Sequence, residues 1–157
     1  MTRAMLFPAL CAIALAQPAC GQDRSVKSAW PDADSVVSIE GKRAGLHVSA
    51  WRDFMPQVGG DGTGSPLMVS VQVTSVNSTP LPPGLTVDSA WVRSPSGVWA
   101  AAPSAEPRPE IGNGLDLMLR GGPKWPTDQL IDVLVRLRLG SGTYYLLARQ
   151  HPIGKTQ

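Results

Sequence analysis

The chain has 157 residues, the length of one domain, and its 16 Gly and 15 Pro favour short elements joined by turns over long helices. The formal net charge is +2, and no block of like charge stands out. A near-neutral chain of this kind lacks the basic surface of a nucleic-acid-binding protein, so we expect no nucleic-acid partner.

Residues 1–19 have the pattern of an export signal. Arg3 supplies the positive start, and Ala4 to Ala16 form an apolar segment that is too short to span a bilayer. No later segment is long and apolar enough to span one. We therefore expect an exported protein that is periplasmic or anchored to the membrane by lipid only, with a partner in the cell envelope.

Cys20 follows this signal directly. The other cysteine, Cys11, lies inside the apolar segment, so the processed chain cannot form an internal disulfide. The sequence A-Q-P-A-C-G around Cys20 resembles the lipobox of bacterial lipoproteins, although Gln17 stands where that motif usually has Leu. We predict that Cys20 is lipidated. The alternative is ordinary cleavage after Ala16, which would leave Cys20 as a thiol.

Residues 20–34 are polar and are expected to form a tether, followed by a domain over residues 35–157. Short alternating or β-rich segments recur through this domain, separated by turn residues. They cover residues 36–40, 46–51, 66–76, 85–93, 98–102, 115–120, 130–139 and 143–149. This pattern predicts an all-β fold, a single antiparallel β-sandwich of about eight short strands, immunoglobulin-like or related. The immunoglobulin cysteines and tyrosine corner are absent.

The last two segments form the clearest hairpin, with Gly140-Ser141 as a type II′ turn. This turn places Val135 opposite Leu146 and Asp132 opposite Arg149. One face of the hairpin is apolar, and the other mixes leucines with charged residues. We regard five residues as candidate interaction residues: Leu134, Arg136, Tyr145, Leu147 and Trp125.

Two explanations compete for that second face. A loop, either 102–114 or 121–126 with Trp125, folds back and covers the leucines. Alternatively the patch is exposed and binds a partner, since apolar patches rimmed by charge commonly do so.

Several short motifs, taken together with their order along the chain, also support the β architecture. They are W-R-D-F-M-P (51–56), P-L-M-V-S-V-Q-V (66–73), L-P-P-G-L (81–85), D-S-A-W-V-R (88–93), G-V-W-A (97–100) and the last hairpin. In this order they resemble a small family of exported bacterial proteins without an assigned activity, over most of Ala50 to Thr156. The resemblance implies an exported location and a β fold, and implies nothing catalytic.

The sequence offers little chemistry. His47 and His151 are far apart, and a His47–Met55 pair at a strand end is a minor alternative for a metal carrier. Residues 140–142 read G-S-G and not G-x-S-x-G, and the glycine-rich run at 59–64 precedes a strand and not a helix. We expect no catalytic, cofactor-binding or metal-binding residue, and hence no enzyme.

Two functions remain. The first is a non-enzymatic exported envelope accessory or protein-interaction module. The alternative is a small-ligand or carbohydrate-binding domain that uses exposed tryptophans, because aromatic rings either fill a core or offer a binding platform. The tryptophans concerned are Trp51, Trp91, Trp99 and Trp125.

Overall fold

The computed structural model describes Trp30, residues 32–56, Gly59, residues 62–105 and residues 114–156. The predicted signal segment and Cys20 lie outside the described residues, as does most of the predicted tether. Nine strands form within the described part of the chain. They are β1 (Val36–Ile39), β2 (Lys42–Asp53), β3 (Leu67–Ser75), β4 (Thr86–Ser94), β5 (Gly97–Ala101), β6 (Ser104–Ala105), β7 (Leu115–Gly122), β8 (Leu130–Leu139) and β9 (Gly142–Thr156).

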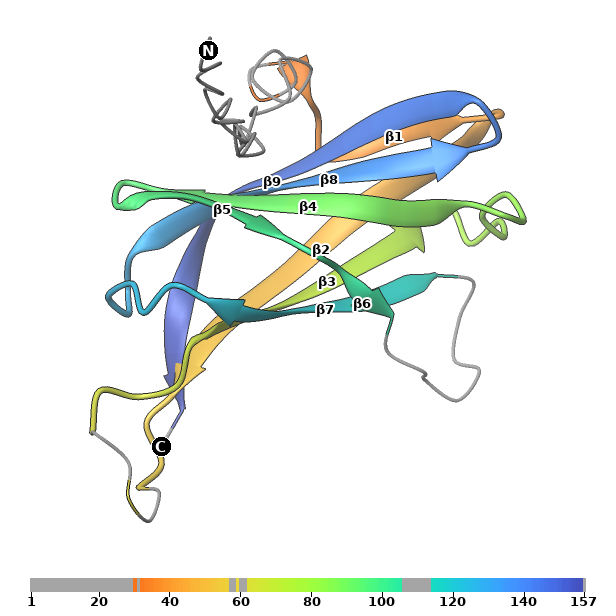
Figure 1. Ribbon diagram of the computed structural model, residues 1–157. Helices are drawn as coiled ribbons and strands as arrows, with labels where there is room; N and C mark the ends of the chain where they lie inside the picture. The colour runs from red at the N-terminus through yellow and green to blue at the C-terminus, as the bar shows by residue number, and fades with distance from the viewer. Residues whose placement is uncertain (1–29, 31, 57–58, 60–61, 106–113, 157) are drawn as a thin grey trace, which may run out of the picture.

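The strands make one curled, mixed sheet in the order β5-β4-β8-β9-β2-β3-β7-β6, with β1 paired to β2 (Figure 1). The all-β prediction is confirmed. The prediction of a purely antiparallel arrangement is wrong, because β2 and β9 run parallel from the pair Ala50–Ile153 to the pair Asp53–Thr156. A contact between segments about a hundred residues apart leaves no local sequence signal.

The sheet curls because the chain crosses between its two halves twice. The first part of β9 pairs with β8, and its last four residues pair with β2. On the other side, β5 pairs with β4, and the chain then passes through Pro103 into β6, which pairs with β7. Figure 1 shows β5 descending from one half to the other. Pro103 lacks an N–H group for a strand ladder, which suits the break between β5 and β6.

The core lies between the two halves and follows the period of two that strands impose. In β3 the residues Leu67, Val69, Val71 and Val73 are fully buried, and their neighbours along the strand are partly exposed. Most buried side chains of β8 and β9 belong to the same cluster, whereas Leu134 and Leu147 form a separate cluster on the opposite face of the sheet. Burying each aliphatic side chain stabilises the fold by about 1.5–3 kcal/mol.

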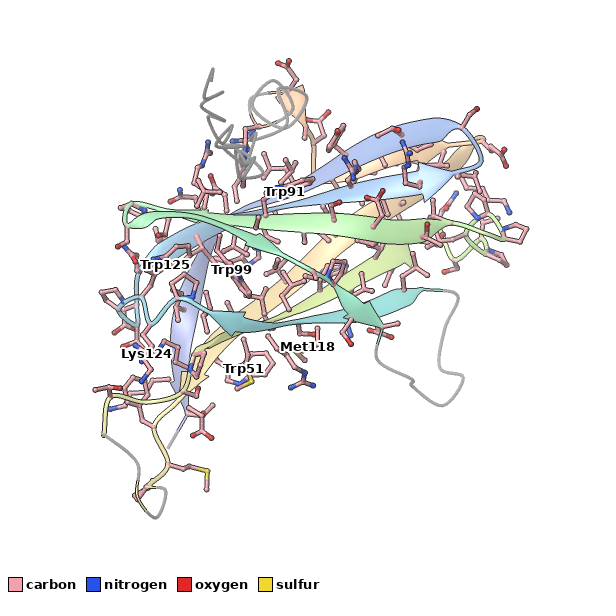
Figure 2. All side chains as sticks on the ribbon, viewed as in Figure 1. Trp51, Trp91, Trp99, Met118, Lys124 and Trp125 are labelled. Atoms are coloured by element: carbon pink, nitrogen blue, oxygen red, sulfur yellow. The ribbon has the colours of Figure 1, made fainter. Side chains whose placement is uncertain are left out.

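Trp99 packs across the open side of the curl, between β5 and β7. A Cβ atom placed on Gly122 would lie 2.7 Å from the Trp99 ring and 3.0 Å from the Cβ of Leu67. Figure 2 shows Trp99 between the halves of the sheet. Glycine at position 122 therefore allows the indole to approach the β7 backbone closely.

The hairpin prediction is confirmed in most of its register. Gly140 and Ser141 form the turn, with Gly140 at φ 56°, and Val135 pairs with Leu146 as expected. The predicted Asp132–Arg149 pairing is wrong as a simple cross-strand pair. The register shifts between Ile131 and Val133, so Asp132 faces a bulge that contains both Arg149 and Gln150.

Candidate interaction face

The surface of β4, β8 and β9 that points away from the core carries most of the predicted interaction residues, and we call it the outer face. Its side chains form rows across the three strands. From one end to the other the rows are Arg93–Asp132, Trp91–Leu134–Leu147, Ser89–Arg136–Tyr145 and Thr86–Arg138–Thr143.

The centre of the outer face is covered. Leu134 and Leu147 are fully buried beneath Trp30, with Trp91 and Tyr145 packed beside them. A covering segment was one of the two explanations offered by the sequence, but the choice of the two loops is wrong. The cover comes from the segment assigned to the tether. Trp125 does not lie on this face, because it is buried in the main core.

Trp30 is held in place by contacts with each of the surrounding strands. The Arg93 guanidinium carbon lies 4.4 Å from the centre of its ring, and the Arg149 Nη2 donates to its carbonyl oxygen at 3.3 Å. Just beyond it, the Leu147 N–H donates to the Asp34 carbonyl at 2.9 Å. A cation–π contact contributes about 0.5–2 kcal/mol, depending on its solvation. The segment is thus fixed by its ring and by its backbone.

An ion pair lies at the Arg93 end of the outer face. The Arg93 Nη2 donates to the Asp132 Oδ2 at 2.6 Å, and the Gln150 N–H donates to Oδ1 at 3.0 Å. Partial burial raises the pKa of Asp132, but these hydrogen bonds and the charges of Arg93 and Arg149 outweigh it and hold the pKa below its usual range. Each of the two carboxylate oxygens of Asp132 therefore accepts a hydrogen bond, one from Arg93 and one from the Gln150 backbone.

A groove of about 410 Å³ opens beside this ion pair. Its apolar side includes Leu130, a residue that is 44% exposed. Gln150 lies on its rim with φ 59°, a left-handed conformation that is uncommon for a residue other than glycine. The bulge gives the rim this shape by placing two consecutive residues opposite Asp132.

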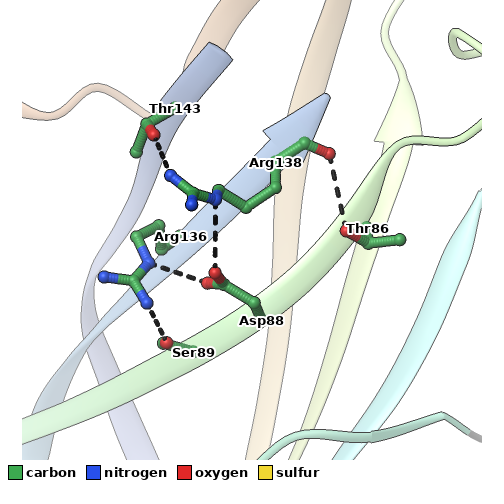
Figure 3. Close-up of polar contacts among 6 residues, drawn as sticks. All are labelled: Thr86, Asp88, Ser89, Arg136, Arg138 and Thr143. Carbon is green, nitrogen blue, oxygen red and sulfur yellow. Dashed lines mark hydrogen bonds and ion pairs between the residues drawn. The ribbon is translucent and has the colours of Figure 1, made fainter. Parts of the chain in front are cut away.

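A second ion-pair cluster lies at the opposite end of the outer face (Figure 3). The Asp88 carboxylate is 2.7 Å from the Arg136 Nε and 3.5 Å from the Arg138 Nε. Arg136 also donates to the Ser89 hydroxyl at 2.8 Å, and Arg138 donates to the Thr143 hydroxyl at 2.5 Å. Arg136 and Arg138, both on β8, thus hold the Asp88 carboxylate, and Ser89 and Thr143 hold the two arginines.

The charge of this cluster follows from its contacts. Burial raises the pKa of Asp88, but the hydrogen bonds from Arg136 and Ser89 and the charges of Arg136 and Arg138 lower it overall. The hydrogen bond to Asp88 in turn raises the pKa of Arg136. The ladder between β4 and β8 shifts between Val87 and Ser89, and the extra residue, Asp88, is the one that reaches the arginines.

A second groove lies where residues 32–34, which follow Trp30 in the chain and which we call the lead-in segment, meet β9. A groove of about 310 Å³ lies between Asp32, Ala33 and Asp34 on one side and Thr143 to Tyr145 on the other. It borders the outer face at Tyr145. The outer face is thus flanked by a groove near each of its ion-pair clusters.

The remaining sequence candidates lie elsewhere. His47 is exposed on β2, and about 20 Å of extended strand separates it from Asp53, so it cannot share a metal ion with Met55 beyond that strand end. The described residues contain no cluster of three or more His, Cys, Asp or Glu side chains suited to a metal ion. Figure 2 shows Trp51 and Met118 together below β2 and β7, on the side remote from Trp91.

Comparison with known proteins adds no relative. The chain matches no family model, no curated protein and no solved structure. The predicted resemblance to exported bacterial proteins therefore stays a prediction. Within the described residues, no helix is long and apolar enough to cross a membrane.

Sequence reasoning missed three parts of the outer face: Trp30, Arg93 and Asp88. A Trp-Pro step in an otherwise polar segment was a signal for the first, since an isolated tryptophan in a tether has no partner of its own to pack against. The other two depend on pairing between β4 and β8 and on a bulge, for which the sequence has no local pattern.

Proposed function

We propose that this protein is a non-enzymatic, exported accessory of the cell envelope and that its domain, a β-sandwich related to the immunoglobulin class, is a protein-interaction module. In this proposal Cys20 carries a lipid that anchors the chain, and the outer face binds an envelope protein. Nucleic acid is not a partner.

The composition of the outer face carries the proposal. Its strands present the arginines Arg93, Arg136, Arg138 and Arg149 against the two carboxylates Asp88 and Asp132. Aromatic and Arg side chains are enriched in the centres of protein interfaces. Paired arginines with fixed geometry suit recognition of a specific surface better than free lysines do, because less side-chain entropy is lost on binding. The face therefore has the chemistry of a specific protein contact.

The position of Trp30 relates this face to the proposed anchor. Trp30 follows Cys20 by ten residues, and such a segment spans at most about 35 Å. A chain that is lipidated at Cys20 would thus keep the outer face within that distance of its membrane anchor. This suits a partner that also lies at the membrane surface.

Site-specific photo-cross-linking in intact cells tests the interaction. A photoreactive residue replaces Leu130 on the outer-face side in one variant and Val76 in the other, since the two residues are similarly exposed, at 44% and 48%. We expect a discrete adduct with an envelope protein from position 130 and none from position 76. Absence of an adduct at position 130, or the same adducts from both positions, would contradict the proposal.

Lipidation is tested separately by mass spectrometry of the mature chain. An acylated N-terminal Cys20 is the expected result, and replacing Cys20 by Ser should release the protein into the soluble fraction. An unmodified chain that begins at Gln17 would refute the anchor.

A further inference from the structure

We infer that the groove beside Arg93 binds a carboxylate that a partner polypeptide carries next to an aliphatic side chain. This inference rests on the proposed function and deepens it, since it names the chemistry that the outer face recognises. It is carried by the geometry of Arg93, the exposure of the ion pair and the apolar side of the groove.

Arg93 is preorganised for a second carboxylate. The Trp30 ring lies 4.4 Å from the guanidinium carbon and covers one face of the group, and Nη2 holds Asp132 at 2.6 Å. The planar fork of an arginine has five N–H donors, so this contact leaves others for a ligand. Because both contacts already fix the plane of the guanidinium, a ligand carboxylate would meet donors that need little further ordering.

The electrostatics of the groove favour an anion. Arg93 has a side-chain exposure of 40%, and Asp132 only 12%, so the solvent-facing member of the pair is the cation. Arg149 also lies close enough to Asp132 for its charge to lower the pKa of that carboxyl. Asp132 also lines the groove, but its carboxylate is less exposed than the Arg93 guanidinium, so the pair presents mainly its positive member to the groove.

The other lining residues define the neighbour of that carboxylate. Leu130 is 44% exposed, and Pro95 lies beside it, so the groove offers an apolar wall next to the arginine. Its volume of about 410 Å³ is within the range of sites for small ligands. The groove therefore accommodates a group of the size of one aliphatic residue with its carboxylate.

A titration followed by amide NMR tests the inference without the unknown partner. The probe is N-acetyl-L-leucine, which has a carboxylate next to an aliphatic side chain, added to the mature chain at constant ionic strength. The matched control is the neutral N-acetyl-L-leucine amide. We expect the acid to shift the amide signals around Arg93, Leu130 and Gln150 with a Kd on the order of millimolar, and the amide to bind at least about fivefold more weakly.

Two variants assign the binding to the fork of Arg93. R93K keeps the charge and loses the fork, and it should weaken binding of the acid about fivefold or more, whereas R138K, at the other end of the outer face, should leave it unchanged. Shifts that are equal for the acid and the amide, unchanged in R93K, or absent would each overturn the inference. A partner adduct at position 130 combined with a failed titration would refute this inference and leave the proposed function standing. A successful titration without any adduct would establish the carboxylate site in the groove and refute the proposed protein partner.

Discussion

Arg52 is a buried cation near the end of β2, with 5% of its surface exposed. It donates to four backbone carbonyls, of Thr63 at 2.5 Å, of Ser65 and Trp125 at 2.9 Å and of Lys124 at 3.4 Å, so it joins the loop before β3 to the segment before β8. The R52M substitution would bury these carbonyls without a donor, and we expect it to lower the free energy of unfolding by about 3 kcal/mol or more.

Urea unfolding at neutral pH measures this effect. R138M is the matched control, because the Arg138 side chain is 48% exposed and its ion pair with Asp88 lies at the surface, so its loss should cost less than about 1 kcal/mol. Equal losses of unfolding free energy in the two variants would show that the contacts of Arg52 stabilise the fold no more than those of a surface arginine.

Asp132 predicts a specific dependence of stability on pH. Its folded pKa lies below the ordinary value of 3.8, so the folded state binds protons less readily than the unfolded state does. The stabilisation is present above that ordinary pKa and is lost as the pH falls through the folded pKa. The difference in unfolding free energy between the wild type and D132N should therefore be largest near neutral pH and shrink below about pH 4. Thermal unfolding from pH 7 to pH 2.5 checks this, and a difference that stays constant over that range would contradict it.

At the scale of elements, the closure between β5 and β7 depends on the fit of Trp99 against Gly122. We expect G122A to destabilise the fold by about 1–3 kcal/mol, because the added methyl group would lie 2.7 Å from the ring and the strand would have to shift. A double-mutant cycle with W99L isolates this contact. G122A should cost much less in the W99L background, and the same cost in both backgrounds would mean that Trp99 is not the obstacle.

The elements also show which parts of the structure could be predicted. Alternation in β3 and the glycine in the β8–β9 turn are local signals, and they determined strand type, the turn and most of the hairpin register. The last predicted strand ends at residue 149, before Pro152 and Gly154, yet β9 continues to Thr156 by changing its partner from β8 to β2. The parallel pairing, the two bulges of the outer face and the packing of Trp30 depend on contacts between distant segments, which short patterns do not encode.

At the scale of the whole molecule, Trp30 makes the lead-in segment part of the domain. W30A should lower the unfolding free energy by about 2–4 kcal/mol and increase binding of a hydrophobic dye, because Leu134 and Leu147 lose their cover. W51A is the matched control, since Trp51 is only half-buried on the remote side and should cost less. Urea unfolding of W30A that matches the wild type would show that the outer face does not need its cover.

Cysteine labelling in native envelope membranes shows whether a partner protein covers the outer face. One full-length variant has Cys in place of Thr143 on the outer face, and a control variant has Cys in place of Ser49, which is exposed on β2. Both are treated with a maleimide in membranes and as purified protein, and each site is quantified by peptide mass spectrometry. We predict that position 143 labels several-fold more slowly in the membranes than in the purified protein, while position 49 labels equally in both. Equal labelling of position 143 in the two preparations would contradict the claim that a partner covers this face.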